Sequence, residues 1–458
     1  MPTSLLISLP ILLLLIATTE GFAQDAAADQ HAAIGVKTTA SNFQRTTHPD
    51  AQWFPEAGLG LFIHWGISSV HGGIDLSWGM IDEKPWDARK SAAITPAEYW
   101  KLAESFNPTG YDPDKWLKAA KDAGFRYVVM TTKHHDGYAM WPSAYGDFGV
   151  KKFLPGVDLV KSFVEACHKY GLKCGLYYSP PDWYFNREYM SFHYGSGDEQ
   201  RFPGRKHFDI NHQPIESLPK PPADWDAKYR AYLRGQITEL LTNYGKIDII
   251  WFDGGPDAMT IDELRALQPG ILINPRMHGY GDFQTPECHF PDKPLQGWWE
   301  MCDIWHTAGW GYAKSAEKYR PLTTWLLPTL ARVRSWGGNF LPNVGPRPTG
   351  EMPDAYYEQL KQMEPWMAAN SEAIFGVKGG PLPPAVNVPV TVRDNTWYMF
   401  LLPNSHEPIV ATSATEPKSV RMLGGDQELA YSWEQGKLTI DPPAGLRSEL
   451  VDVVKVVW

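Results

Sequence analysis

Residues 246–256 have the sequence KIDIIWFDGGP, in which an apolar run ends at a carboxylate followed by two glycines. Isoleucine and aromatic residues in an unbroken run are typical of a parallel strand buried on both faces. Such a strand would carry Asp253 to the rim of a sheet or barrel. In a (β/α)8 barrel, groups at the carboxyl ends of the strands form the active site. Asp253 is therefore a catalytic candidate, although Asp-Gly is also common in turns after strands.

A second segment repeats this arrangement. Residues 126–138, RYVVMTTKHHDGY, predict another buried strand, which ends at Lys133, His134, His135 and Asp136. Two strands that end in polar clusters predict one site built from several strand ends. Because neighbouring strand residues point in opposite directions, one of the two histidines could instead face the surrounding helices.

Helix-like and strand-like patterns alternate along most of the chain. Helices are predicted at 95–106, 113–125, 158–172, 228–245, 261–270 and 354–370, and further strands at 59–66, 173–183, 270–276 and 337–346. Thr95 is the expected N-cap of the first helix, with Pro96 in its first turn. Repeated units of this spacing predict a parallel sheet. A closed TIM barrel is favoured over a doubly wound sheet because the sequence has no glycine-rich nucleotide loop.

The pattern changes near residue 379, where short alternating runs separated by Pro, Gly and Asn begin. This pattern predicts a small antiparallel β-sandwich with a structural or weak sugar-binding role. The 458 residues suffice for a barrel of about 250 residues or more and a smaller domain. We therefore expect a (β/α)8-type barrel at 46–375, followed by a C-terminal β-sandwich at 380–458.

The N-terminal region predicts export to the periplasm or the exterior. Residues 5–16 form an apolar run of signal-peptide length, too short to span a bilayer, and small residues precede a cleavage site after Ala23. The segment before this run lacks Lys and Arg, unlike most signal peptides. We expect residues 1–23 to be a signal peptide and the Ala-rich 24–45 to be flexible. No other segment predicts a membrane span.

Composition narrows the choice of partners. The net charge of −10 disfavours nucleic acid. Aromatic residues make up 13% of the chain, and such rings stack on sugar rings, although most of the 20 tryptophans are expected to fill the core.

The four cysteines lack metal-site spacing, so free buried thiols are expected, with a Cys288–Cys302 bridge as the alternative. Nothing in the sequence fixes whether the chain forms a homo-oligomer.

Several stretches, in order along the chain, resemble α-L-fucosidases of glycoside hydrolase family 29. They are LGLFIHWG (59–66), WLKAAKDAGFRYVVMTTKHHDGYAMWPS (116–143), GLYYS (175–179), IIWFDG (249–254), NPR (274–276), TPE (285–287), WEMC (299–302), GWGY (309–312) and GGNFLPNVGPRPTG (337–350). The resemblance covers nearly the whole predicted barrel and implies a barrel followed by a β-sandwich. It also implies a retaining exo-α-L-fucosidase that acts on fucosylated glycans without a cofactor.

The resemblance implies a mechanism that needs a nucleophilic carboxylate and a second acid. It assigns the nucleophile to Asp253. The acid/base is Glu287 or Glu300, with Glu287 favoured, because both match positions where the family carries acids. Each acid has a structural alternative: Glu287 as a solvated loop residue, and Glu300 as a buried partner of Arg276 or of a backbone amide.

The resemblance also implies a set of sugar-binding residues. They are His64, Trp78, His134, His135, Tyr178, Arg276 and Trp310. Neutral imidazoles suit hydroxyl groups because they can donate and accept hydrogen bonds. Trp310 would line the pocket beside the methyl group of fucose, and Tyr177 would replace Tyr178 if the strand phase differs by one residue. Three histidines can also bind zinc, but no motif such as H-E-x-x-H supports a metal site.

One position departs from the family pattern. The family often has a Glu-Trp pair after the first strand, and here the sequence is Leu76-Ser77-Trp78, without the acid. Strictness for fucose is therefore open, and one alternative is a retaining glycosidase for another L-type sugar such as an L-galactoside. A fucose-binding pseudoenzyme is a further alternative, which Asp253 and the two candidate acids disfavour.

Overall fold

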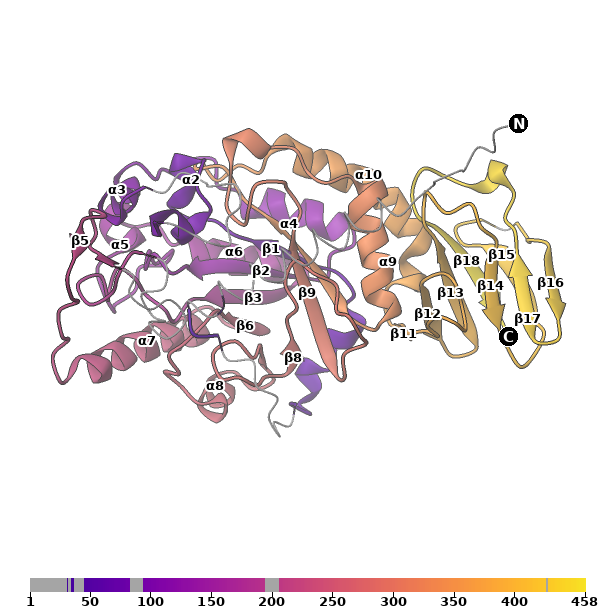
Figure 1. Ribbon diagram of the computed structural model, residues 1–458, viewed down its shortest axis with the longest axis horizontal. Helices are drawn as coiled ribbons and strands as arrows, with labels where there is room; N and C mark the ends of the chain where they lie inside the picture. The colour runs from indigo at the N-terminus through magenta and orange to yellow at the C-terminus, as the bar shows by residue number, and fades with distance from the viewer. Residues whose placement is uncertain (1–30, 32–33, 37–44, 83–93, 194–205, 426) are drawn as a thin grey trace, which may run out of the picture.

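The computed structural model describes residues 31, 34–36, 45–82, 94–193, 206–425 and 427–458 (Figure 1). The predicted signal peptide lies outside the described residues, as does most of the segment 24–45. Within the described part of the chain, no helix combines the length and the apolar character that crossing a bilayer requires.

Eight parallel strands form a nearly closed barrel in the order β7-β6-β3-β2-β1-β10-β9-β8, which confirms the predicted fold class. The strands are β1 (Gly60–Ile63), β2 (Tyr127–Lys133), β3 (Lys173–Tyr178), β6 (Ile249–Phe252), β7 (Leu272–Ile273), β8 (Phe283–Gln284), β9 (Trp298–Ile304) and β10 (Asn339–Val344). The first strand pairs with the last, since Phe62 lies opposite Asn343 and Ile63 opposite Val344. All carboxyl ends therefore meet at one rim.

Helices connect these strands. They are α2 (Ser68–His71), α3 (Pro96–Lys101), α4 (Pro113–Asp122), α5 (Val150–Phe153), α6 (Leu159–Lys169), α7 (Trp225–Thr242), α8 (Ile261–Leu267), α9 (Leu327–Ser335) and α10 (Asp354–Asn370). Of these, α3, α4, α6, α7, α8 and α10 lie where the sequence pattern predicts helices, whereas α2, α5 and α9 were not predicted. The predicted start of α3 is confirmed: the Thr95 side chain accepts from Glu98 N–H, and Glu98 binds back to the Thr95 N–H. A two-stranded ribbon, β4 (His207–Phe208) with β5 (Pro214–Ile215), precedes α7.

Alternate strand residues fill two different cores. Tyr177 and Trp251 belong to the core inside the barrel, whereas Tyr178 and Ile250 belong to the core between the strands and the helices. This alternation follows from the pleat of a β-strand. It decides which side chains can reach the rim of the barrel from inside.

The C-terminal region forms two antiparallel sheets beside α9 and α10 (Figure 1). One sheet has the order β11-β12-β13-β18-β15 and the other β14-β17-β16. The strands are β11 (Lys378–Gly379), β12 (Val390–Arg393), β13 (Thr396–Leu401), β14 (Ile409–Thr412), β15 (Ser419–Met422), β16 (Tyr431–Glu434), β17 (Lys437–Ile440) and β18 (Asp452–Val457). Apolar residues of both sheets share one core, which confirms the predicted β-sandwich.

The four cysteines are free thiols, as predicted, and the alternative Cys288–Cys302 bridge is not formed. Cys167, Cys174 and Cys302 are buried, whereas Cys288 is only partly buried.

Candidate active site

A pocket opens at the carboxyl ends of the barrel strands, where active sites of such barrels lie. Its lining combines two carboxylates, one arginine, three histidines and several apolar side chains. The lining residues are His31, Ile34, Phe62, His64, Trp78, His134, Tyr177, Trp251, Asp253, Arg276, Glu287, Cys302 and Trp310. A polar centre with an apolar surround is typical of a site for a small polar ligand.

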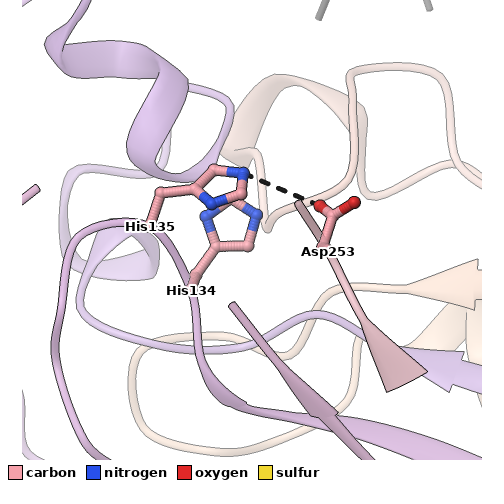
Figure 2. Close-up of side chains that lie close together, drawn as sticks. All are labelled: His134, His135 and Asp253. Carbon is pink, nitrogen blue, oxygen red and sulfur yellow. Dashed lines mark ion pairs between the residues drawn. The ribbon is translucent and has the colours of Figure 1, made fainter. Parts of the chain in front are cut away.

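Asp253 directly follows β6 and is held on both carboxylate oxygens. Its Oδ1 accepts from Arg276 Nη1 at 2.9 Å, and its Oδ2 accepts from the Tyr177 hydroxyl at 2.8 Å. His135 Nε2 lies 3.6 Å from Oδ2, and Figure 2 shows this ring directed toward the carboxylate. With only 8% of its surface exposed, Asp253 is a rigidly oriented carboxylate at the rim.

Arg276 joins Asp253 to the second carboxylate of the pocket. Its Nη2 donates to Glu287 Oε2 at 2.6 Å, and its guanidinium lies over the Trp251 ring at 4.4 Å. Burial opposes the charge on Arg276, but Glu287 and Asp253 outweigh burial and raise its pKa. The same guanidinium thus holds both carboxylates, each through a different nitrogen.

Glu287 is the second carboxylate, and only 6% of its surface is exposed. The alternative of a solvated loop acid is therefore wrong. Burial raises the pKa of Glu287, but Arg276 and then His31 outweigh burial, so the pKa lies well below its usual range. Glu287 is ionised in the ligand-free protein.

Glu300 lies outside the pocket lining and is fully buried inside the barrel. Its Oε2 accepts from the Tyr127 hydroxyl at 2.5 Å, and its Oε1 accepts from Trp251 Nε1 at 3.2 Å. Burial raises the pKa of Glu300 to about 7. A raised pKa alone would favour Glu300 as the acid, but position comes first, because an acid must reach the leaving oxygen. The geometry supports a buried structural role for Glu300, but its partners are Tyr127 and Trp251 and not the predicted Arg276 or a backbone amide.

His64 lines the pocket as a neutral imidazole. Burial lowers the pKa of His64 to about 4. Its Nδ1 lies 2.6 Å from Asn343 Oδ1, and the Asn343 amide nitrogen donates to the Trp310 carbonyl oxygen. That amide orientation makes Nδ1 the donor, so His64 Nε2 is left to accept a hydrogen bond from a ligand hydroxyl.

His134 lines the pocket, whereas His135 is fully buried outside the lining and directs its Nε2 toward Asp253 Oδ2, so the alternative in which one histidine faces the helices is wrong. The strand β2 ends at Lys133, whose Nζ points outward to Asp182 at 2.9 Å, and the chain turns immediately afterwards. His134 Nδ1 lies 2.6 Å from Ser77 Oγ, and burial lowers its pKa far below the usual range. Burial also lowers the pKa of His135 to about 3. Neutral rings of this kind can bind hydroxyl groups.

The zinc alternative has one geometric basis. Potential ligand atoms of His134, His135 and Asp253 all lie within 4.8 Å of one another. However, His134 Nδ1 already bonds to Ser77, and both Asp253 oxygens bond to other groups. The Arg276 charge beside Asp253 further disfavours a divalent cation at this point.

The tyrosine assignment from sequence is wrong by one residue. Tyr178 is fully buried on the helix side of the barrel, where its hydroxyl donates to Gln236 Oε1 at 2.8 Å and accepts from Lys133 Nζ at 3.0 Å. Tyr177 lines the pocket instead. The pleat of β3 explains the difference, because adjacent side chains project to opposite faces.

This geometry predicts different results for two tyrosine variants. Tyr177→Phe should lower kcat/KM by about 10-fold to 100-fold, because a hydrogen bond to a charged group is worth about 1.5–3 kcal/mol. Tyr178→Phe is the matched control, since it also removes a tyrosine hydroxyl, but from a hydrogen-bond network outside the pocket. Steady-state kinetics of both variants provide the measurement. A larger loss for Tyr178→Phe would contradict this placement.

Several lining residues are absent from the sequence prediction. They are His31, Ile34, Phe62, Trp251 and Cys302. Phe62 and Trp251 precede His64 and Asp253 by two residues, so strand alternation offered a way to find them. His31 and Ile34 carry no such pattern, because they lie in the Ala-rich segment before the barrel. The predicted Trp78 and Trp310 both line the pocket.

Two buried carboxylates around a histidine-rich and aromatic pocket at the rim of a parallel barrel are typical of a glycoside hydrolase. The family model for α-L-fucosidases matches residues 23–372. The chain belongs to this family, glycoside hydrolase family 29, and is an α-L-fucosidase.

Individual relatives agree with this assignment. The chain is 28% identical over 447 residues to the tissue α-L-fucosidase of Bos taurus, covering 90% of this chain and 89% of that protein. α-L-Fucosidase isoenzyme 1 from Paenibacillus thiaminolyticus is 30% identical with a TM-score of 0.73, covering 89% and 98% of the two chains. Thermotoga maritima α-fucosidase, solved in complex with a mechanism-based inhibitor, is 27% identical with a TM-score of 0.69, covering 90% and 97%.

Proposed function

We propose that this α-L-fucosidase is a retaining exo-enzyme that releases terminal L-fucose from glycans through a covalent fucosyl-Asp253 intermediate. One observation carries the proposal: Arg276 bridges Asp253 and Glu287, the two carboxylates of the pocket, at 2.9 and 2.6 Å. Two buried carboxylates held in one pocket by one guanidinium support a two-carboxylate mechanism, and the family resemblance favours its retaining form, in which the second carboxylate attacks directly.

The first half of the reaction forms the intermediate. Asp253 Oδ attacks the anomeric carbon as the bond from this carbon to the glycosidic oxygen breaks, and Glu287 gives its proton to that oxygen. Because Glu287 is ionised in the free protein, it must gain this proton as the substrate binds. That proton comes from solvent, and because only the protonated acid can donate a hydrogen bond to the glycosidic oxygen, substrate binding itself favours the neutral form.

The second half regenerates the enzyme. Glu287 takes a proton from water, the water oxygen attacks the anomeric carbon, and the Asp253 ester bond breaks. Esterification removes the negative charge of Asp253 and leaves Arg276 to Glu287 alone. The carboxylate form of Glu287 is then favoured, as a general base requires.

The pocket also supports recognition of a deoxy sugar. His64, His134 and His135 are the proposed hydroxyl ligands, and their neutral state suits that role. Phe62 and Trp310, whose ring centroids lie 6.1 Å apart, offer an apolar surface for the C6 methyl group. Such a surface suits fucose, because no hydroxyl on C6 needs a hydrogen-bond partner.

Hydrolysis of 4-nitrophenyl α-L-fucoside, followed by proton NMR of the released sugar, tests the proposal. We expect α-L-fucose to form first and the β-anomer to appear only by mutarotation. First appearance of the β-anomer would show inversion instead. Ser77 stands where the family often has an acid, so 4-nitrophenyl α-L-galactoside is the informative second substrate. Faster turnover of the galactoside than of the fucoside would show that the enzyme prefers L-galactose.

Export is part of this proposal. The apolar run at 5–16 and the cleavage site after Ala23 support a signal peptide that delivers the enzyme to glycans outside the cytoplasm.

A further inference from the structure

The chain before the barrel reaches the reactive centre. His31 Nε2 lies 2.9 Å from Glu287 Oε2, although the two residues are 256 positions apart in the sequence. Ile34 lines the same pocket, and only 5% of its surface is exposed. These contacts place two side chains from outside the predicted barrel beside both carboxylates.

The backbone anchors this segment to the loop after the nucleophile. The anchoring bond runs from Gly255 N–H to the Ile34 carbonyl oxygen at 3.2 Å. A second bond, from Val36 N–H to the His31 carbonyl oxygen at 2.9 Å, joins two residues that both precede the barrel. A Cβ on Gly254 would lie 2.3 Å from the Ile34 carbonyl oxygen, and Gly254 has a φ of +91°. The glycine after Asp253 is therefore what allows the segment to pack so closely.

We propose that His31 is a positioning residue for Glu287, and that His31 and Ile34 together form the leaving-group side of the pocket. The inference rests on the proposed function, because it takes Glu287 as the acid/base. An acid that protonates the leaving oxygen must face the leaving group. A residue bonded to that acid lies on the same side of the sugar.

The contacts indicate how His31 acts. Among the described residues, the two hydrogen bonds to the Glu287 carboxylate both end on Oε2, one from Arg276 and one from His31. Two donors on one oxygen fix the carboxylate plane and place the transferable proton on Oε1. Arg276 is also bound to Asp253, so His31 is the contact that orients Glu287 independently of the nucleophile.

The test is a series of aryl α-L-fucosides with leaving groups of increasing pKa. His31→Ala should lower kcat/KM by about tenfold for the poorest leaving group, which needs the acid, and by much less for the best one. His31→Gln, which keeps a donor near the position of Nε2, should restore most of the loss. His406→Ala, an exposed histidine of the β-sandwich, is the matched control.

Ile34 is tested through the size of the leaving group. Ile34→Ala should raise KM for the phenyl fucoside by about fivefold relative to the methyl fucoside, because it removes apolar contact on that side only. Equal changes for both substrates would overturn the placement of Ile34.

Three results would overturn the role of His31. The first is an equal fall for every leaving group, which indicates a structural effect. The second is a failure of His31→Gln to restore activity. The third is a rise in rate, which indicates that the contact mainly opposes protonation of Glu287. Wild-type turnover and Asp253→Asn are measured alongside. If Asp253→Asn stays active, the proposed function fails, and that outcome is separate from any result for His31.

Discussion

Asp253→Asn should abolish turnover of 4-nitrophenyl α-L-fucoside, with kcat lower by at least about 10⁴-fold, since removal of a covalent nucleophile can cost about 10⁶-fold in other hydrolases. The amide is not a nucleophile, yet it has the same shape as the carboxylate. It can still accept from Arg276 Nη1, which lies 2.9 Å from Oδ1. The loss should therefore appear in kcat without a matching loss of stability.

The measurement combines kcat with the melting temperature of each variant. Asp114→Asn is the matched control, because that acid pairs with Lys169 on the protein surface and does not line the pocket. It should behave as wild type. Activity in Asp253→Asn within a factor of ten of wild type would exclude Asp253 as the nucleophile.

Glu287→Gln should lower kcat/KM by about 10³-fold for substrates with poor leaving groups, within the usual range for loss of a general acid/base. For activated aryl fucosides the rate of the first step should fall less, because their leaving groups need little help from an acid. The second step still needs the base, so the intermediate should accumulate. Azide needs no general base, and it should restore turnover by forming α-L-fucosyl azide. Rates with and without azide, together with identification of the product, provide the measurement.

Glu300→Gln is the matched control for this prediction. Glu300 is fully buried between Tyr127 and Trp251, so its amide variant should keep activity within about threefold of wild type. Slow turnover that azide rescues in Glu300→Gln, together with normal turnover in Glu287→Gln, would reverse the assignment.

The architecture was predictable because its patterns are long and periodic. The buried run ending at Asp253 and the alternating runs after residue 379 each predict the element that forms. The phase of β3 was not predictable in the same way. Its residues are buried on both faces, so the polarity pattern that would separate Tyr177 from Tyr178 is missing.

The choice between the two acids depended on three-dimensional position. Glu287 and Glu300 both occur in stretches that resemble the family, and only the fold shows that the first lines the pocket while the second lies beneath it. His31 was beyond reach of the sequence, because its partner is 256 residues away and its own surroundings are Ala-rich.

The bridging position of Arg276 has a consequence for the reaction as a whole. In the reactive complex Asp253 carries the negative charge, and in the ester intermediate Glu287 carries it, while the guanidinium bonded to both remains in place. One anion therefore faces one fixed cation in both of these states, and the total charge of the three groups is the same in both. The negative charge thus moves across the pocket from one carboxylate to the other while the same cation stays bonded to both, so neither charged state is left without its counter-ion.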